Sequence, residues 1–325
     1  MSLEFIISQS LYFIIPLLVV AIAGLFAERS GTINIALEGL MMIGAFFGVL
    51  FIHFMQEAHI LDNNQQLLLI LALLVAGVSG IIFSSLLAFL AINMKADQTI
   101  GGTALNLLAA AFVIFLSKAI IKDTRVYFKA RFQLKSTFLN KVPFLNYIFF
   151  DRAYLTTYIG IIILIITIVI FKYTKFGLRL SSCGEHPEAA QSVGINVVKY
   201  RWIGVLISGF LGAMGGLIYV IPTAISFDGS VSGYGFLALA VLIFGQWKPG
   251  RIFLSAIFFG TFSMLSVSFF GFGFIKDFME KYPKVPLSMI IRMLPYLVTM
   301  IALAISSKKS RAPKAAGKPF EATSI

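Results

Sequence analysis

The sequence predicts an all-α protein that crosses a membrane about nine times, and three observations lead to that fold class. Of its 325 residues, 59% are hydrophobic and only 12% are charged, about half the charged share of an average soluble domain. The mean hydropathy is +0.93. Apolar runs recur along the chain, each close to the roughly 20 residues that a helix needs to span a bilayer. Lipid can surround this much apolar surface, whereas a soluble fold would expose adhesive patches.

The apolar runs give the predicted spans in order, and the seventh is the shortest. They are Phe5–Ala27, Leu37–Phe54, Gln66–Asn93, Ile100–Ile121, Ala153–Phe171, Trp202–Ile221, Tyr234–Gln246, Ile252–Ile275 and Leu287–Ser306. Residues 1–305 therefore form one transmembrane domain. The basic segment 306–325 that follows is expected to be a disordered tail.

The basic residues behind the formal charge of +12 predict the orientation. One group lies between the fifth and sixth spans and another in the tail, with four spans between them, so both lie on the same side. Lys and Arg beside spans favour the cytoplasm, which places the C-terminus inside and the N-terminus outside. The loop 122–152 is then external although it is basic, and we expect it to lie along headgroups or contact an external partner. The two cytoplasmic groups are Lys172, Lys175, Arg179, Lys199 and Arg201, and Lys308, Lys309, Arg311, Lys314 and Lys318.

Several function classes are excluded by what the sequence lacks. No basic module with stacking aromatic residues is visible, so nucleic acid is not an expected partner. The sequence contains no P-loop, so this chain is not expected to bind ATP. The single cysteine, Cys183, excludes an internal disulfide. The three histidines have no metal-ligand spacing and no catalytic nucleophile–base pair is apparent, so we expect no metal site, no cofactor in this chain and no enzymatic activity.

A short helix is predicted in the cytoplasmic connection 172–201. Pro187 suits the first turn of a helix, Glu188 favours its positive end, and Gly194 suits a left-handed C-cap. The helix is too short to span a membrane, and its small residues Ala189 and Ala190 could dock on a cytoplasmic motor protein. The alternative is a surface helix that only closes the loop.

Four polar residues around the end of the first span are candidates for either structure or transport. Glu28 and Arg29 could form an ion pair that closes the first two spans together. Asn34 and Glu38 could instead lie on the solute path, because ionisable or polar groups inside apolar spans tend to face a partner or a wet cavity. Asn106 on the fourth span is a similar candidate, since an amide both donates to and accepts from sugar hydroxyls or base edges.

Two Gly-x-x-x-Gly patterns indicate close helix packing. Gly44 and Gly48 lie in the second predicted span, and Gly212 and Gly216 lie in the sixth. Small residues at this spacing let two helix backbones approach each other within a membrane.

Four motifs in the same order resemble the bacterial ABC permeases for simple sugars and nucleosides, in the clan of branched-chain permeases. The first is the stretch Ala27–Phe46, which is most similar to the shorter nucleoside-type permease subunit. The second and third are Gly101–Asn106 and Gly233–Trp247. The fourth is the coupling region, where Glu-Ala-Ala is followed by Gly-Ile-Asn. The resemblance runs from about residue 16 to residue 305.

The resemblance implies a type II-like importer fold in a bacterial cell membrane. It also implies a second permease, a cytoplasmic ATPase that holds ATP and magnesium, and an extracellular binding lipoprotein. The short helix would then be the coupling helix that contacts the ATPase, and the resemblance places the contact at Glu185, His186, Pro187, Glu188, Ala189, Ala190, Ser192 and Gly194.

Two rivals to nucleoside import remain open on the sequence. One is an ABC permease for simple sugars or branched-chain amino acids, because the sequence does not fix the ligand. The other is a proton- or sodium-coupled secondary transporter, although such carriers often show internal repeats and none is visible here.

Overall fold

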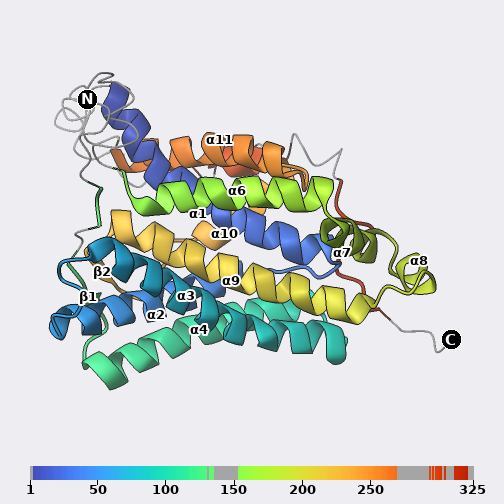
Figure 1. The fold of residues 1–325 in the computed structure, drawn as a ribbon, viewed down its shortest axis with the longest axis horizontal. Helices are drawn as coiled ribbons and strands as arrows, with labels where there is room; N and C mark the ends of the chain where they lie inside the picture. Colours follow the sequence, from blue (N-terminus) through green and yellow to red (C-terminus); the bar gives the residue numbers. More distant parts are fainter. Residues whose placement is uncertain are drawn as a thin grey trace.

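The computed structural model describes residues 3–129, 132–134, 153–268, 293, 295, 297–301, 304 and 311–320. Its long helices run side by side along the longest axis of the molecule (Figure 1). The helices are α1 (Leu3–Arg29), α2 (Leu37–Glu57), α3 (Gln65–Ala88, extended by a π-helical turn at Phe89–Asn93), α4 (Gln98–Ile121), α6 (Leu155–Tyr173), α7 (Lys175–Glu185), α8 (Pro187–Ser192), α9 (Val197–Thr223), α10 (Tyr234–Phe244) and α11 (Pro249–Ser268); the strands are β1 (Val126–Tyr127) and β2 (Ser226–Phe227).

Seven helices of the described part are long and apolar enough to cross a membrane, namely α1, α2, α3, α4, α6, α9 and α11. They coincide with the first six predicted spans and the eighth, which confirms a polytopic all-α membrane protein. The sixth begins at Val197 rather than at Trp202. The ninth predicted span, Leu287–Ser306, lies mostly outside the described residues, so the count of nine stays a prediction.

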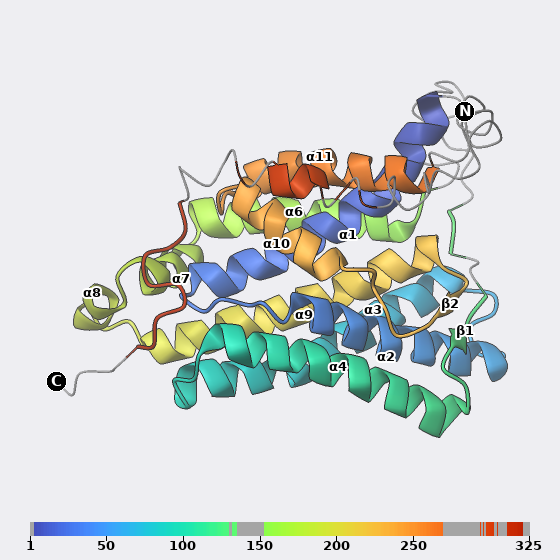
Figure 2. The ribbon, with the colours of Figure 1, turned by 180° about the vertical axis from the view of Figure 1, so that it is seen from behind.

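The seventh predicted span contains a helix that is too short to cross a bilayer by itself. Its apolar residues form α10, a helix of 11 residues, which is about 16 Å long at 1.5 Å per residue and therefore shorter than a hydrocarbon core of about 30 Å. It starts after Gly233, whose φ of +77° is a left-handed conformation that a residue with a side chain adopts reluctantly. Seen from behind, α10 lies across the middle of the molecule (Figure 2).

The core lies where α1 and α9 pack together and against α2 and α3. The central run of α1, Leu18–Ala23, has no exposed surface, as expected for a helix that is apolar on every side. On the outer helices, by contrast, apolar side chains such as Leu107 and Phe115 of α4 and Ile165 of α6 are more than half exposed. In a bilayer such side chains face lipid or a partner helix.

The two Gly-x-x-x-Gly patterns pack helix against helix, as predicted, and they meet each other. A Cβ added to Gly44 of α2 would collide with the backbone of Ala213, and one added to Gly216 of α9 would collide with the carbonyl oxygen of Met41. At Gly48 an added Cβ would lie 2.6 Å from Leu217 Cδ2. The α2 and α9 backbones therefore approach closely because neither helix carries a side chain at these points.

The two ends of the bundle carry different features. Strands β1 and β2 pair antiparallel, with Val126 opposite Phe227, at one end. At the other end lie α7, α8 and the described C-terminal segment (Figure 1). The tail was expected to be disordered, but its residues 311–320 form a turn that hydrogen-bonds to the bundle, with Ala315 N donating to Gly184 O at 2.8 Å. For these residues that expectation is wrong.

Candidate functional site

The connection between α1 and α2 is a tight turn fixed by the end of α1. The N–H groups of Ser30 and Thr32 both donate to the carbonyl of Ala27, at 3.0 and 3.1 Å, and Gly31 N donates to Glu28 O at 3.0 Å. Residues 32–34 have no regular structure, and a turn at Ile35 and Ala36 precedes α2. This short irregular stretch brings the polar candidates of the sequence to one place.

Glu28 and Arg29 each find another partner, so the predicted ion pair between them is corrected. The Glu28 carboxylate accepts from Trp247 Nε1 at 2.5 Å. Arg29 donates through Nη2 to the carbonyl of Trp247 at 2.9 Å and lies 3.7 Å from Glu185 Oε1. Adjacent residues on a helix point about 100° apart, which turns the two side chains toward different neighbours. Together they tie the end of α1 to α7 and to the connection after α10.

Asn34 is buried and connects the turn to α9. Its Nδ2 donates to Ser208 Oγ at 2.8 Å, and its Oδ1 accepts from Ala36 N at 3.1 Å. Gln98, which comes just before the Gly101-Gly102 motif, accepts from Ile33 N at 2.7 Å. Both side chains satisfy groups that the irregular backbone would otherwise leave unpaired in an apolar interior.

Glu38 holds the start of α10. Its two carboxylate oxygens accept from Gly233 N at 2.9 Å and from Gly235 N at 2.7 Å. The first N–H groups of a helix have no partner within the helix, and a carboxylate there also meets the positive end of the helix dipole. Glu38 of α2 thus acts as a cap for α10.

Asn106 holds the start of α2 in the way that Glu38 holds the start of α10. Its Oδ1 accepts from Gly39 N at 2.7 Å, and its Nδ2 donates to Ile35 O at 2.9 Å. The close approach of α4 that this needs is possible at Gly102, where an added Cβ would lie 3.0 Å from Ile35 Cβ.

The three residues predicted for the solute path are therefore gathered around the first turn of α2. Asn34 is 0% exposed, and Glu38 and Asn106 are each 8% exposed. Their polar atoms form hydrogen bonds with groups of this chain. These bonds stabilise the starts of α2 and α10 and the irregular connection before α2. A place on the solute path stays a prediction.

The short helix that was predicted to begin at Pro187 has the structure that the sequence predicts. Pro187 opens α8, which ends at Ser192, and Gly194 follows with a φ of +82°. Thr174 Oγ1 accepts from Gly177 N to cap α7, and Asn196 Oδ1 accepts from Lys199 N to cap α9. Helix α8 lies beyond the ends of the long helices (Figure 1).

The outward face of α8 differs from the one predicted. Ala190 is buried, 3% exposed, against Cys183 and Val197, so it cannot share a docking face with Ala189, and that part of the prediction is wrong. Ala189 is exposed, and Val193 is 73% exposed. Of the other predicted contact residues, His186, Glu188, Ser192 and Gly194 are exposed, whereas Glu185 and Pro187 are half-buried.

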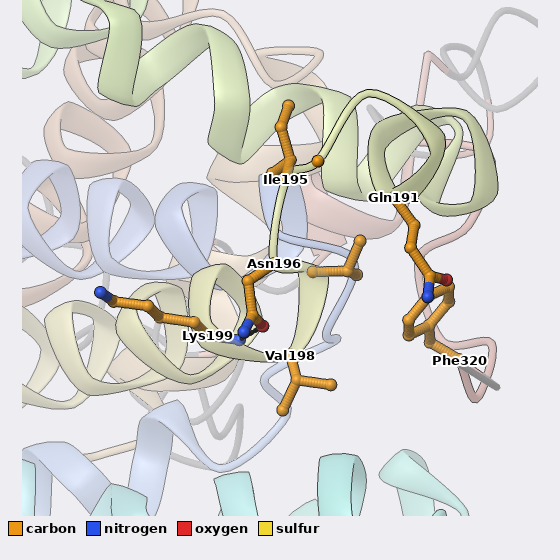
Figure 3. Close-up of a pocket in the computed structure, with 8 residues that line it drawn as sticks. Gln191, Ile195, Asn196, Val198, Lys199 and Phe320 are labelled. Carbon is orange, nitrogen blue, oxygen red and sulfur yellow. Dashed lines mark hydrogen bonds between the residues drawn. The ribbon is translucent and has the colours of Figure 1, made fainter. Parts of the chain in front are cut away.

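Two hollows flank α8. The first, of about 510 Å³, is lined by Gln191, by residues 194–199 and by Phe320. Figure 3 shows the Phe320 ring lying beside the Gln191 side chain, on the far side of the hollow from Lys199. The second, of about 560 Å³, lies between the start of α8 and the C-terminal segment and includes Arg201 among its lining residues.

Comparison with known proteins decides the family. The family model described as "Branched-chain amino acid transport system / permease component" matches residues 6–303. The chain belongs to this permease family. It is therefore a multi-pass membrane transport subunit and not an enzyme. No solved structure matches the chain significantly.

Individual relatives cover almost the whole permease. It is 39% identical over 322 residues to the guanosine ABC transporter permease protein NupQ of Bacillus subtilis, covering 98% of this chain and 97% of NupQ. It is 37% identical over 318 residues to the nucleoside ABC transporter permease protein NupC of Lactococcus lactis, covering 97% and 96%. A more distant match, to the nucleoside ABC transporter permease protein NupB of Lactococcus lactis, has 23% identity and covers 78% of this chain and 70% of NupB.

Sequence reasoning missed three residues of this permease that organise the site. Trp247 forms hydrogen bonds with both Glu28 and Arg29. Ser208 accepts a hydrogen bond from Asn34. Arg201 is only 1% exposed, although it was interpreted as one of the charges that mark the cytoplasmic side. Trp247 closes a motif quoted for the family resemblance, which was its only signal. Nothing in the local sequence distinguishes Ser208 from other span serines or Arg201 from its basic neighbours.

Cys183 gives a direct check on how α7 and α8 pack. The thiol is buried under α8, and this burial raises its pKa to about 11. Only the thiolate reacts quickly with maleimides, so at pH 7.5 we expect little labelling of the detergent-purified permease and rapid labelling after denaturation. Because Cys183 is the sole cysteine, a Cys183→Ala chain carrying Ser192→Cys is the exposed control. Fast labelling of native Cys183 would contradict the packing of α8.

Proposed function

We propose that this permease imports nucleosides as one transmembrane subunit of an ABC transporter. The observation that supports the substrate is the identity of 39% and 37%, over nearly the full length, to proteins named as guanosine and nucleoside permeases. The Ala27–Phe46, Gly101–Asn106 and Gly233–Trp247 motifs, on which the family resemblance rests, form the contacts among α2, α4 and α10 described above.

A second permease is the expected partner within the membrane. This chain matches both NupC and NupB, two nucleoside permeases of the same bacterium, which supports a transporter built from two related but unequal subunits. The exposed apolar side chains of α3 and α4, such as Ile82 at 67% and Leu107 at 75%, provide surface for a partner helix as well as for lipid. The solute path would then run along the interface between the two permeases.

A cytoplasmic ATPase, carrying ATP and magnesium, would bind at the α8 end of the bundle. The basic residues of the α7–α9 region and of the C-terminal segment lie at that end (Figure 1), as the positive-inside rule expects of a cytoplasmic side. The β1–β2 end and the start of α1 would then face outward, where an extracellular binding lipoprotein delivers the solute.

The docking role of α8 can be tested on its exposed face. Ala189→Glu and Val193→Glu place a charge where an apolar contact with the ATPase is expected, without touching the buried Ala190. We expect the amount of ATPase that co-purifies with the permease to fall at least about tenfold, which is about 1.4 kcal/mol of binding energy. Lys175→Gln, exposed on the first turn of α7, is the matched control. Undiminished co-purification with both glutamates in place would refute docking at α8.

The substrate class can be tested on the assembled importer. In the presence of the binding protein, ATP hydrolysis by the purified complex should rise on adding guanosine or other nucleosides and stay unchanged on adding ribose or leucine. Stimulation by ribose or leucine alone would instead favour the alternative, a permease for simple sugars or branched-chain amino acids.

A further inference from the structure

The C-terminal segment Arg311–Phe320 lies across three parts of the cytoplasmic end. Ala315 N donates to Gly184 O, at the end of α7, at 2.8 Å, and Gly317 N donates to Gly31 O, in the α1–α2 connection, at 3.2 Å. The carbonyl of Lys318 accepts from Arg201 Nη1, on α9, at 2.9 Å. We call this segment the strap. Each of these bonds joins the strap to a residue that lies more than a hundred positions earlier in the sequence.

Arg201 is the residue that holds the strap. It is 1% exposed, and its guanidinium group lies under the strap with Cζ 5.7 Å from the centre of the Phe320 ring, within the range of a cation–π contact. Its other face lies against Gly31, where an added Cβ would come within 2.9 Å of Nη2. A buried guanidinium group is costly unless its donors find acceptors, so the strap carbonyl contributes to keeping this side chain in place.

The strap also supports α8 from behind. Phe320 packs with Cys183, Ala190 and Val197, the small apolar cluster beneath α8. Gly184, which precedes α8 by three residues, is itself packed against the end of α1, since an added Cβ would collide with the carbonyl oxygen of Arg29. Movement of α8 would therefore act on Phe320 as well as on Val197 of α9, which lies beneath Ala190.

These contacts lead from the strap to the polar residues at the start of α2. Gly31, held by the strap and by Arg201, is three residues before Asn34 and seven before Glu38. Glu38 in turn holds the first turn of α10. The strap thus bonds directly both to α7 and to the α1–α2 connection, alongside the ion pair between Arg29 and Glu185.

We propose that the strap, positioned by Arg201 and Phe320, couples movement of α8 to the α1–α2 connection and so sets how much transport each ATP hydrolysis yields. The proposal rests on the import function above. Arg201 and Phe320 are then positioning residues for the strap. The strap couples movements, whereas the outer face of α8 docks the ATPase.

The test uses the complete importer, with its partner permease, ATPase and binding protein, in liposomes. The variants are Phe320→Ala, Arg201→Ala, and a chain that ends at Ser310. Arg311→Gln, exposed at the start of the strap, is the matched control. Three quantities are measured for each: the ATPase retained by the complex, the rate of ATP hydrolysis, and the solute imported per ATP hydrolysed.

We expect the complex to keep its ATPase and to hydrolyse ATP while solute imported per ATP falls about fivefold or more, the range of typical coupling energies between sites. Arg201→Lys should restore part of this ratio, because lysine keeps the charge but lacks the planar fork of donors. A merely structural role would lower import and hydrolysis together and leave the ratio unchanged. If Arg201→Ala does not fold, Phe320→Ala and the shortened chain decide.

An unchanged ratio in Phe320→Ala and in the shortened chain would overturn the proposal. Loss of the ATPase from both would also overturn it, because the strap would then be a docking contact. Failure of the nucleoside assignment is distinguishable from either result. In that case the unmodified importer responds to another solute, and the ratio is measured with that solute.

Discussion

Gly216→Ala is expected to destabilise the permease strongly, although it adds one methyl group. The new Cβ would meet the carbonyl oxygen of Met41 closer than real Cβ atoms approach any neighbour. A backbone carbonyl cannot move aside as a flexible side chain can, so α2 and α9 would have to separate. Overpacking of this kind costs about 1–3 kcal/mol or more. The measurement is the apparent melting temperature in detergent, together with the share of monodisperse protein.

Gly212→Ala is the matched control for that experiment. It lies one turn earlier on α9, and its added Cβ would find its nearest neighbours, Leu37 Cδ2 and Leu40 Cβ, at 3.5 Å, which is ordinary contact distance. Both substitutions gain the same helix propensity, roughly 1 kcal/mol at most, so their difference isolates the clash. Equal melting temperatures for the two variants would contradict the α2–α9 packing.

Glu38→Ala is the second substitution with a large expected effect. It removes both acceptors of Gly233 N and Gly235 N at the start of α10. Hydrogen bonds to a charged group contribute about 1.5–3 kcal/mol each, and a buried donor left without a partner costs about 1–3 kcal/mol. We therefore expect a lower melting temperature and loss of transport, since α10 would no longer be fixed against α2.

Glu38→Gln separates this capping role from a role in binding solute. Glutamine keeps the shape and one acceptor oxygen, so a cap would be partly retained and the melting temperature should lie between those of Glu38→Ala and the unmodified chain. A residue that contacts solute would behave differently: Glu38→Gln would then change nucleoside affinity at an unchanged melting temperature. A Glu38→Ala variant that melts like the unmodified chain would contradict the capping role.

The membrane fold was predictable because its main signal is local. Each span is an apolar run of bilayer length, and the Gly-x-x-x-Gly patterns could be identified without knowing their partners. Hydropathy alone makes the 13 residues Tyr234–Gln246 look like a short continuous span, whereas the helix that they form is 11 residues long. That α10 is a short internal helix depends on Glu38 of α2, which lies nearly two hundred residues earlier and supplies its cap.

The sequence predicted where the candidate site lies better than it predicted which residues bond to one another there. The motifs around Asn34, Glu38 and Asn106 do meet in space, but their hydrogen-bond partners are set by tertiary contacts that the sequence does not display. The same holds for Ala190, which turned inward because Cys183 and Val197 lie beneath it. The tail was expected to be disordered from its charge, whereas Arg201 and Gly184 supply the contacts that fix it.

Uptake of radiolabelled guanosine into liposomes that hold the complete importer tests the central claim most directly. The binding protein is supplied outside, and ATP is present or absent inside. ATP-driven nucleoside import predicts uptake that requires internal ATP, persists when ion gradients are collapsed, and is competed by unlabelled nucleosides but not by ribose or leucine. Uptake without ATP that follows a proton or sodium gradient would contradict it.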